Sequence, residues 1–194
     1  MRLTRPLCLA SASPRRREFL ERYGLPFVPF SPQVDESVLE GESPGAHVSR
    51  LAEAKAQAAA VLYPDHVVLA GDTVVVHGDA ILGKPVDEED ARRMLTLLAG
   101  SEHRVLSAYL LWDAQAGENR AKVVETRVVF RELPPQWIQW YSRQDESRDK
   151  AGAYGIQGLG GAMVERIEGS YPNVVGMPIE HILWDMIDKG WIAL

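Results

Sequence analysis

The 194 residues of this chain suffice for one large domain or one domain with two lobes, and can bury a core without disulfides or structural metal. Hydrophobic residues make up 46% and charged residues 25%, which excludes a disordered chain, a collagen-like repeat and a coiled coil. The net charge of −6 argues against binding of a nucleic-acid polymer. A few local lysines and arginines still allow a pocket for a small anion.

The single cysteine, Cys8, excludes an intramolecular disulfide and a cysteine zinc cluster. It lies in the apolar run 6–10 with no histidine nearby, so we expect an inert core thiol. The basic start at 1–5 precedes an apolar run that is too short for a signal peptide. No apolar stretch approaches the ~20 residues of a membrane span. We therefore expect a cytoplasmic protein with no membrane partner.

The N-terminal half alternates strands with amphipathic helices. The expected elements are a strand at 7–10, a helix at 15–23 with Ser13 as N-cap, an irregular Pro-rich segment at 26–44, a helix that starts after Ser43-Pro44 and ends near 63, strands at 66–70 and 73–77, and a hairpin return at 80–82. Gly71 and Asp72 are expected to interrupt the strand between 66 and 77.

The C-terminal half continues in the same manner. We expect a helix at 88–98 capped by Asp87, strands at 105–112 and 121–130 around a polar turn, a helix at 134–142, a glycine-rich loop at 149–161, a strand at 162–167 and a last helix at 179–189. Interior-type strands mixed with hairpins predict an α/β fold with a mixed sheet.

Two glycine patterns resemble known motifs and fail on inspection. Residues 78–84 match GxxxxGK, but Pro85 stands where a P-loop needs Ser or Thr, and the glycines fall in a predicted hairpin. The glycines at 152–161 do not fit the dinucleotide fingerprint GxGxxG and follow no strand. We therefore expect neither a P-loop nor a Rossmann-type site.

The turn at 11–17 places hydroxyls and arginines at the start of a predicted helix. Ser13, Arg15 and Arg16 surround an N-terminus whose free N–H groups and dipole favour anions. Arginines normally avoid this end of a helix, so an anion that compensates them is one interpretation. The alternative is that they merely solvate the first turn.

Further charged residues lie in turns or on an apolar face. Asp72 follows a buried strand, where an unpaired acid would be costly, and is either a site residue or a turn-stabilising aspartate. Lys55 lies on the apolar face of its helix and either snorkels to solvent or points into an anion site. Together with Glu36 and Lys84 these residues form an inventory suited to phosphate chemistry. Gln157, among glycines, can present an amide to a heterocycle.

Seven segments in a fixed order carry a closer resemblance. They are LASASPRRREFL at 9–20, VDE at 34–36, AEAKA at 52–56, GDTVV at 71–75, GKP at 83–85, DKAGAYGIQGLGG at 149–161 and GSYPNVVGMPI at 169–179. No single segment is diagnostic, but the ordered set is highly specific and spans nearly the whole chain. The sequence resembles the Maf family of nucleoside triphosphate pyrophosphatases.

The resemblance implies an elongated mixed sheet flanked by helices, in two lobes with a central cleft, similar to inosine triphosphate pyrophosphatases. It implies a single Maf-like domain over 1–194. The implied reaction is hydrolysis of a nucleoside triphosphate to the monophosphate and pyrophosphate, with a divalent metal cation, Mg or Mn. The family's catalytic aspartate falls on Asp72, and Glu36 and Asp72 are the implied metal ligands. Ser13, Arg16, Lys55 and Lys84 fall on substrate-binding positions.

Three further positions divide the family by substrate. Arg15, Thr73 and Gln157 match the branch that acts on dTTP and UTP, and modified pyrimidine triphosphates are allowed as substrates. The branch that acts on 7-methyl-GTP typically has Trp, Gln and Glu there and is the alternative. A nucleotide-binding regulator of septum formation is an alternative from another class. We expect a small nucleotide as partner, with a homodimer allowed as the assembly.

Overall fold

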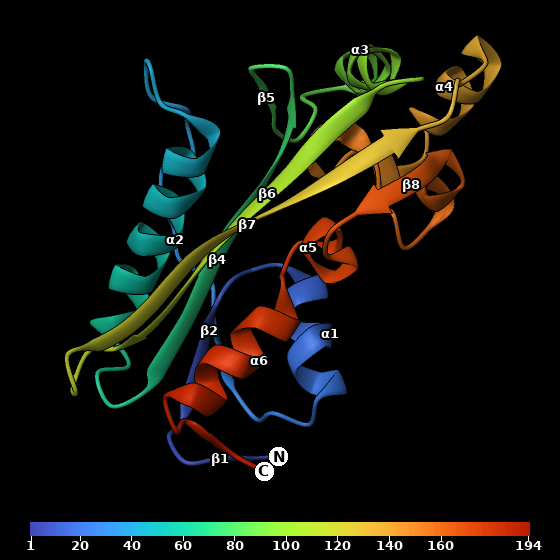
Figure 1. The fold of residues 1–194 in the computed structure, drawn as a ribbon. Helices are drawn as coiled ribbons and strands as arrows, with labels where there is room; N and C mark the ends of the chain where they lie inside the picture. Colours follow the sequence, from blue (N-terminus) through green and yellow to red (C-terminus); the bar gives the residue numbers. More distant parts are fainter. The chain divides into compact units, whose positions relative to one another are not determined.

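A seven-stranded mixed sheet with helices beside it forms the framework of a computed structural model that describes residues 1–194 (Figure 1). The strands are β3 (Val28–Phe30), β2 (Leu7–Ala10), β4 (Val67–His77), β6 (Glu102–Asp113), β7 (Glu118–Phe130) and β8 (Val164–Glu168) in sheet order, with β5 (Ala80–Leu82) paired to β4. β2 is parallel to both β3 and β4. β5 is antiparallel to β4, and β8 is antiparallel to β7. The predicted α/β fold with a mixed sheet is confirmed.

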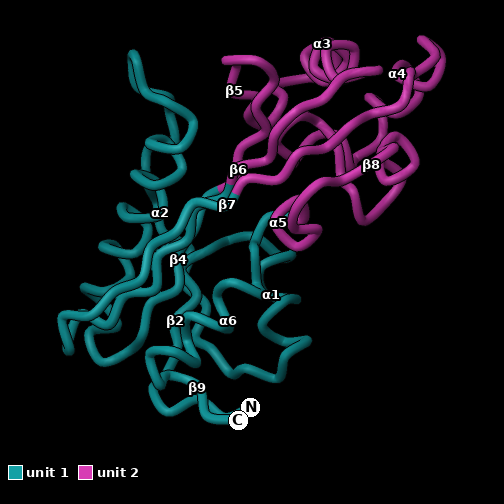
Figure 2. The backbone as a smooth tube through the Cα atoms, in the orientation of Figure 1, with its two compact units in different colours: residues 1–72, 107–124, 176–194 teal, residues 73–106, 125–175 magenta.

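The chain divides into two compact units, which Figure 2 colours separately. Unit 1 comprises residues 1–72, 107–124 and 176–194, and unit 2 comprises residues 73–106 and 125–175. The long strands β4, β6 and β7 each contribute residues to both units.

Unit 1 packs helices on both faces of its strands. α2 (Pro44–Ala60) covers one face, and α1 (Pro14–Arg22) and α6 (Ile179–Asp188) cover the other (Figure 1). Small side chains let α2 approach closely: Ala56 and Ala59 pack against Cys8 and Ala70. Burial raises the pKa of the Cys8 thiol to about 11, which agrees with the expected core thiol. β1 (Arg2–Leu3) pairs with β9 (Ile192–Ala193) near the chain ends.

Unit 2 has a core of its own. Its helices are α3 (Glu88–Leu98), α4 (Pro135–Tyr141) and α5 (Tyr171–Val175), with 3-10 turns at Asp145–Ser147, Ala151–Ala153 and Leu159–Met163. The Asp87 carboxylate accepts a hydrogen bond from the Asp90 amide at 2.8 Å, so α3 begins at the predicted cap. The apolar face of α3 packs with Phe130 and Tyr141 in this core.

The predicted break at Gly71 and Asp72 is wrong, because β4 runs without interruption from Val67 to His77. A Cβ on Gly71 would lie 2.7 Å from the Ala108 carbonyl oxygen, so glycine here permits close approach of the neighbouring backbone.

Other differences from the predicted elements are local. β3 forms inside the segment predicted to be irregular, α2 ends three residues before the predicted end near 63, and β6 and β7 begin three residues earlier than predicted. Of the two glycines in 78–84, Gly78 lies in the turn between β4 and β5, as predicted, whereas Gly83 directly follows β5. No helix of the structure has both the length and the apolar character needed to cross a membrane.

We expect His103 to make unit 2 acid-labile. Burial, with a smaller contribution from His77, lowers the pKa of His103 to about 3, and its Nε2 lies 2.8 Å from the Tyr154 hydroxyl. The unfolded state binds a proton as pH falls through ~6.5, whereas the folded state does not, so stability falls below that pH. The loss from this group should reach about 2 kcal/mol at pH 5.

Urea unfolding of the wild type and of His103→Phe at pH 7 and pH 5 measures this effect. The variant should be less stable at pH 7, because Tyr154 loses its partner, yet should lose less stability between the two pH values. Equal losses in both proteins would contradict a buried neutral His103.

Candidate functional site

The ammonium of Lys55 joins two carboxylates in unit 1. Its Nζ lies 2.8 Å from Asp72 Oδ1 and 2.5 Å from Glu36 Oε1. The Lys55 side chain is 8% exposed and that of Asp72 13%, whereas Glu36 is half exposed. The three predicted residues therefore form one cluster that is buried at Lys55 and Asp72 and reaches solvent at Glu36.

The periodicities of β4 and α2 explain this meeting. Alternate residues of a strand share a face, so Asp72 lies on the same side of β4 as Val68 and Ala70, which pack against α2. Lys55 belongs to the buried face of α2 and precedes Ala56 of that same contact. The interpretation that Lys55 snorkels to solvent is wrong, because its charged end lies among carboxylates rather than in water.

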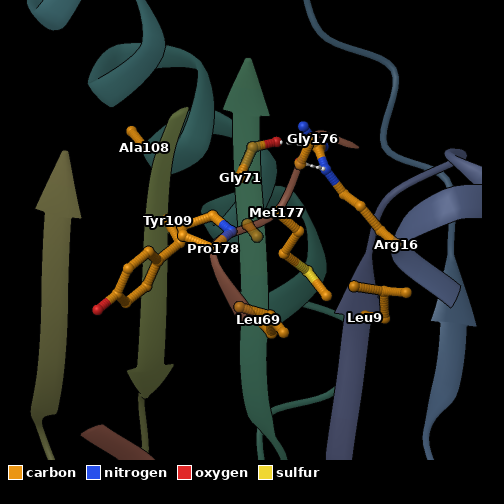
Figure 3. Close-up of a pocket in the computed structure, with 10 residues that line it drawn as sticks. Leu9, Arg16, Leu69, Gly71, Ala108, Tyr109, Gly176, Met177 and Pro178 are labelled. Atoms are coloured by element: carbon orange, nitrogen blue, oxygen red, sulfur yellow. Dashed lines mark hydrogen bonds between the residues drawn. The ribbon is translucent and has the colours of Figure 1, made fainter. Parts of the chain in front are cut away.

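Arg16 binds the backbone at Gly71 and Gly176 (Figure 3). Its Nη1 donates to the Gly71 carbonyl at 2.6 Å and to the Ser11 hydroxyl at 3.3 Å, and its Nε donates to the Gly176 carbonyl at 2.9 Å. Burial lowers the pKa of Arg16, and the charge of Asp72 opposes that shift. Arg16 thus joins α1 to the residue before Asp72 and to the segment that precedes α6.

The cavity drawn in Figure 3 is too small for a ligand. It encloses about 10 Å³ between Leu9, Leu69 and Met177, next to Arg16. A larger hollow of about 570 Å³ lies between α2 and strands β6 and β7, and none of the predicted site residues lines it. The cluster around Lys55 is therefore the feature of unit 1 that matches the predicted chemistry.

The start of α1 has the predicted arrangement but a different use of Ser13. Ser13 occupies the N-cap position and Pro14 the first turn, yet the Ser13 side chain makes no capping hydrogen bond. Its backbone amide instead donates to the Ser11 hydroxyl at 3.1 Å. Arg15 lies in a first turn that contains no acidic residue, so the helix dipole there has no internal counter-charge.

The remaining predicted residues belong to unit 2. Thr73 continues β4, Lys84 is exposed after β5, and Gln157 is exposed in the glycine-rich loop. The Gly152 amide donates to the Gly83 carbonyl at 3.0 Å, which fixes the loop of Gln157 to the turn of Lys84. The turn that holds Lys84 and the loop that holds Gln157 are thus joined by the hydrogen bond between Gly152 and Gly83.

A divalent metal would find two protein ligands here. No group of three or more His, Cys, Asp or Glu side chains is placed to hold a metal ion. Glu36 and Asp72 both reach the Lys55 ammonium, so their oxygens already meet at one cation. One or two carboxylates, completed by substrate phosphates and water, suit Mg²⁺, and the donor set is compatible with that mode.

Sequence reasoning missed the partners of Arg16. The sequence shows Ser11 only as one hydroxyl in a turn with several, and the carbonyls of Gly71 and Gly176 carry no side-chain signal. A glycine before Asp72 and a glycine before Met177-Pro178 do not indicate in the sequence that Arg16 donates to their carbonyls.

Comparison with known proteins gives consistent matches along the chain. A family model described as Maf-like protein matches residues 6–189. A protein of Hahella chejuensis named dTTP/UTP pyrophosphatase is 49% identical over 180 residues, which cover 90% of this chain and 88% of that protein. One of Syntrophus aciditrophicus with the same name is 43% identical over 188 residues, covering 97% of this chain and 92% of that protein.

A solved structure is similar at a much lower level. The nucleoside-triphosphatase / dITP/XTP pyrophosphatase of Mycobacterium abscessus aligns with 95% of this chain and 94% of its own, at 15% identity and a TM-score of 0.43. That similarity is too low to establish a shared fold.

Proposed function

This chain belongs to the Maf-like protein family, and we propose that it hydrolyses dTTP and UTP, and modified pyrimidine triphosphates, to the monophosphate and pyrophosphate. The names of its relatives at 43–49% identity support this substrate class. The observation that carries the proposal is the buried contact of Lys55 with Asp72, extended to Glu36. Because the family match runs from residue 6 to residue 189, we infer that both units serve one domain.

Each predicted site residue has a role in this reaction. Asp72 orients a water molecule and accepts its proton as the water oxygen attacks the α-phosphorus, while the bond to the bridging oxygen breaks and pyrophosphate leaves. Cationic and hydroxyl groups hold the phosphate oxygens; these are Ser13, Arg15, Arg16, Lys55 and Lys84. Glu36 and Asp72 would hold a divalent cation, Mg or Mn, which supplies positive charge near the phosphates.

Thr73 and Gln157 favour a pyrimidine base. The Gln157 amide offers two donors and an acceptor, which suits the imide edge of thymine and uracil. Gln157 is exposed, so this edge is available to a ligand.

We propose that the activity is cytoplasmic, because the nucleoside triphosphates that it would hydrolyse form a pool there. A homodimer stays a prediction, which sedimentation of the purified protein tests.

We expect dTTP and UTP to have the highest kcat/KM among dTTP, UTP, CTP, GTP and 7-methyl-GTP. A base whose edge does not match leaves polar groups of the protein without hydrogen-bond partners, at a cost of ~1–3 kcal/mol each. The kcat/KM for dTTP and UTP should therefore exceed that for the other triphosphates by about tenfold or more. Gln157→Glu should lower kcat/KM for dTTP and UTP, because a carboxylate cannot donate to a base carbonyl.

Release of pyrophosphate and of orthophosphate, measured on one preparation, checks these expectations. A preference for 7-methyl-GTP would assign the chain to the other substrate branch of the family, without contradicting the proposed pyrophosphatase reaction. Orthophosphate in place of pyrophosphate would show that another bond is broken. Tight nucleotide binding without either product would favour a nucleotide-binding regulator.

A further inference from the structure

The glycine-rich loop that carries Gln157 closes around one carboxylate. Glu146 Oε1 accepts hydrogen bonds from the Tyr141 hydroxyl at 2.6 Å and from the Gly160 amide at 2.8 Å, and its Oε2 accepts one from the Leu159 amide at 3.1 Å. The Tyr141 oxygen accepts a further bond from the Gly155 amide at 3.1 Å. Both ends of the segment 155–160 are therefore bound to the same pair of side chains.

Packing inside the loop leaves no room for a side chain where the carboxylate sits. A Cβ on Gly158 would lie 1.8 Å from Glu146 Oε2 and 2.7 Å from its Cδ. The glycine next to Gln157 is therefore required by the position of Glu146. An added methyl group could enter only if the Glu146 carboxylate moved away.

Electrostatics make this contact stronger than an ordinary loop hydrogen bond. Partial burial works against the charge of Glu146, but hydrogen bonds from Tyr141, Gly160 and Leu159 outweigh it and hold the pKa of this carboxyl below its usual value. The carboxylate is thus charged at neutral pH, and hydrogen bonds to charged acceptors are about twice as strong as neutral ones. Tyr141 is fully buried and fixes the carboxylate against the core of unit 2.

We propose that Glu146 is a positioning residue for substrate selection: its carboxylate fixes the loop so that Gln157 presents its amide to the base. The proposal rests on the proposed function, in which Gln157 contacts the base. Glu146 itself acts only through the loop, since its oxygens are taken by Tyr141 and two loop amides. It therefore determines how well the base is held and has no part in breaking the phosphate bond.

Glu146→Gln tests the proposal with the least change in size. Whichever way the glutamine amide is turned, its NH₂ group faces the N–H of either Leu159 or Gly160, and two donors cannot form a hydrogen bond. At least one of the loop hydrogen bonds is therefore lost. We expect KM for dTTP to rise about tenfold while kcat stays within about threefold. Hydrogen exchange of the amides in 155–160 should accelerate. Glu165→Gln, an exposed glutamate of β8, is the matched control and should change neither quantity.

Gly158→Ala displaces the carboxylate without altering it, and should reproduce the KM increase and the faster loop exchange of Glu146→Gln. A melting temperature for each variant shows that the protein remains folded. An unchanged KM together with unchanged loop exchange in Glu146→Gln, or a loss confined to kcat, overturns the proposal.

A double-mutant cycle separates this proposal from the function on which it rests. If Glu146 acts through Gln157, then Glu146→Gln should add little to the KM of a Gln157→Ala protein. Additive effects would show that Glu146 acts elsewhere and overturn the positioning role. If Gln157→Ala alone leaves the preference for dTTP over GTP unchanged, the proposed contact of Gln157 with the base fails. Faster loop exchange in Glu146→Gln would still show that the carboxylate fixes the loop.

Discussion

Asp72→Asn is expected to lower kcat for pyrophosphate release by ~10²-fold or more. The change keeps the size of the side chain but removes the charge that accepts a proton from water, and loss of a general base has an effect of this order. It also removes a charged ligand for a divalent cation, which adds to the loss. The Lys55 ammonium, 2.8 Å from Asp72 Oδ1, can still donate to the amide oxygen, so the local packing should persist.

Asp79→Asn is the matched control, because Asp79 is an exposed aspartate in the turn between β4 and β5. It should have wild-type kcat. Steady-state rates over a range of Mg²⁺ and Mn²⁺ concentrations show whether excess metal restores Asp72→Asn. Partial recovery would assign metal binding to Asp72, and no recovery would favour the general base. Turnover within a few-fold of the wild type would remove Asp72 from the mechanism.

The elements of the fold could largely be predicted from the sequence, because their ends carry local signals. Ser13-Pro14, Ser43-Pro44 and Asp87 begin three helices at the predicted points. β3 was missed because a three-residue strand with a central proline has almost no periodicity of its own. The break predicted at Gly71 was wrong because glycine there serves close strand contact rather than a turn.

The members of the cluster of Lys55, Asp72 and Glu36 could be predicted from the sequence, but the contacts between them could not, because these contacts depend on how the chain folds. Lys55 on an apolar face admitted two interpretations until the register of β4 placed Asp72 toward α2. Arg16 was predicted from its place at a helix start, but its bonds to two backbone carbonyls depend on chain segments far apart in sequence. Glu146 gave no signal at all, because a glutamate near a glycine-rich loop is ordinary on a protein surface.

Lys55→Met is expected to lower kcat/KM for dTTP by ~10²-fold. Methionine keeps the length of the apolar stem, and the change removes the ammonium that meets Glu36 and Asp72. In the proposed reaction that charge stabilises the phosphate oxygens, and loss of one such preorganised group costs about this much. The free energy of unfolding should also fall, because the largely buried Asp72 carboxylate loses its partner. Rates must therefore be measured at a temperature where urea unfolding shows the variant to be folded.

Lys189→Met provides the comparison, since Lys189 pairs with Glu118 at 2.8 Å on the surface of the same unit. An exposed pair of this kind contributes ~0–1 kcal/mol, so activity and stability should both stay near those of the wild type. Lys55→Arg adds a second comparison, because it keeps the charge but replaces a compact ammonium by a wider planar group. If Lys55→Met lost stability but kept wild-type kcat/KM, Lys55 would be a structural counter-ion for Asp72 and would not contact the phosphates. If Lys55→Arg retained more activity than Lys55→Met at equal stability, the positive charge itself would be what the reaction requires.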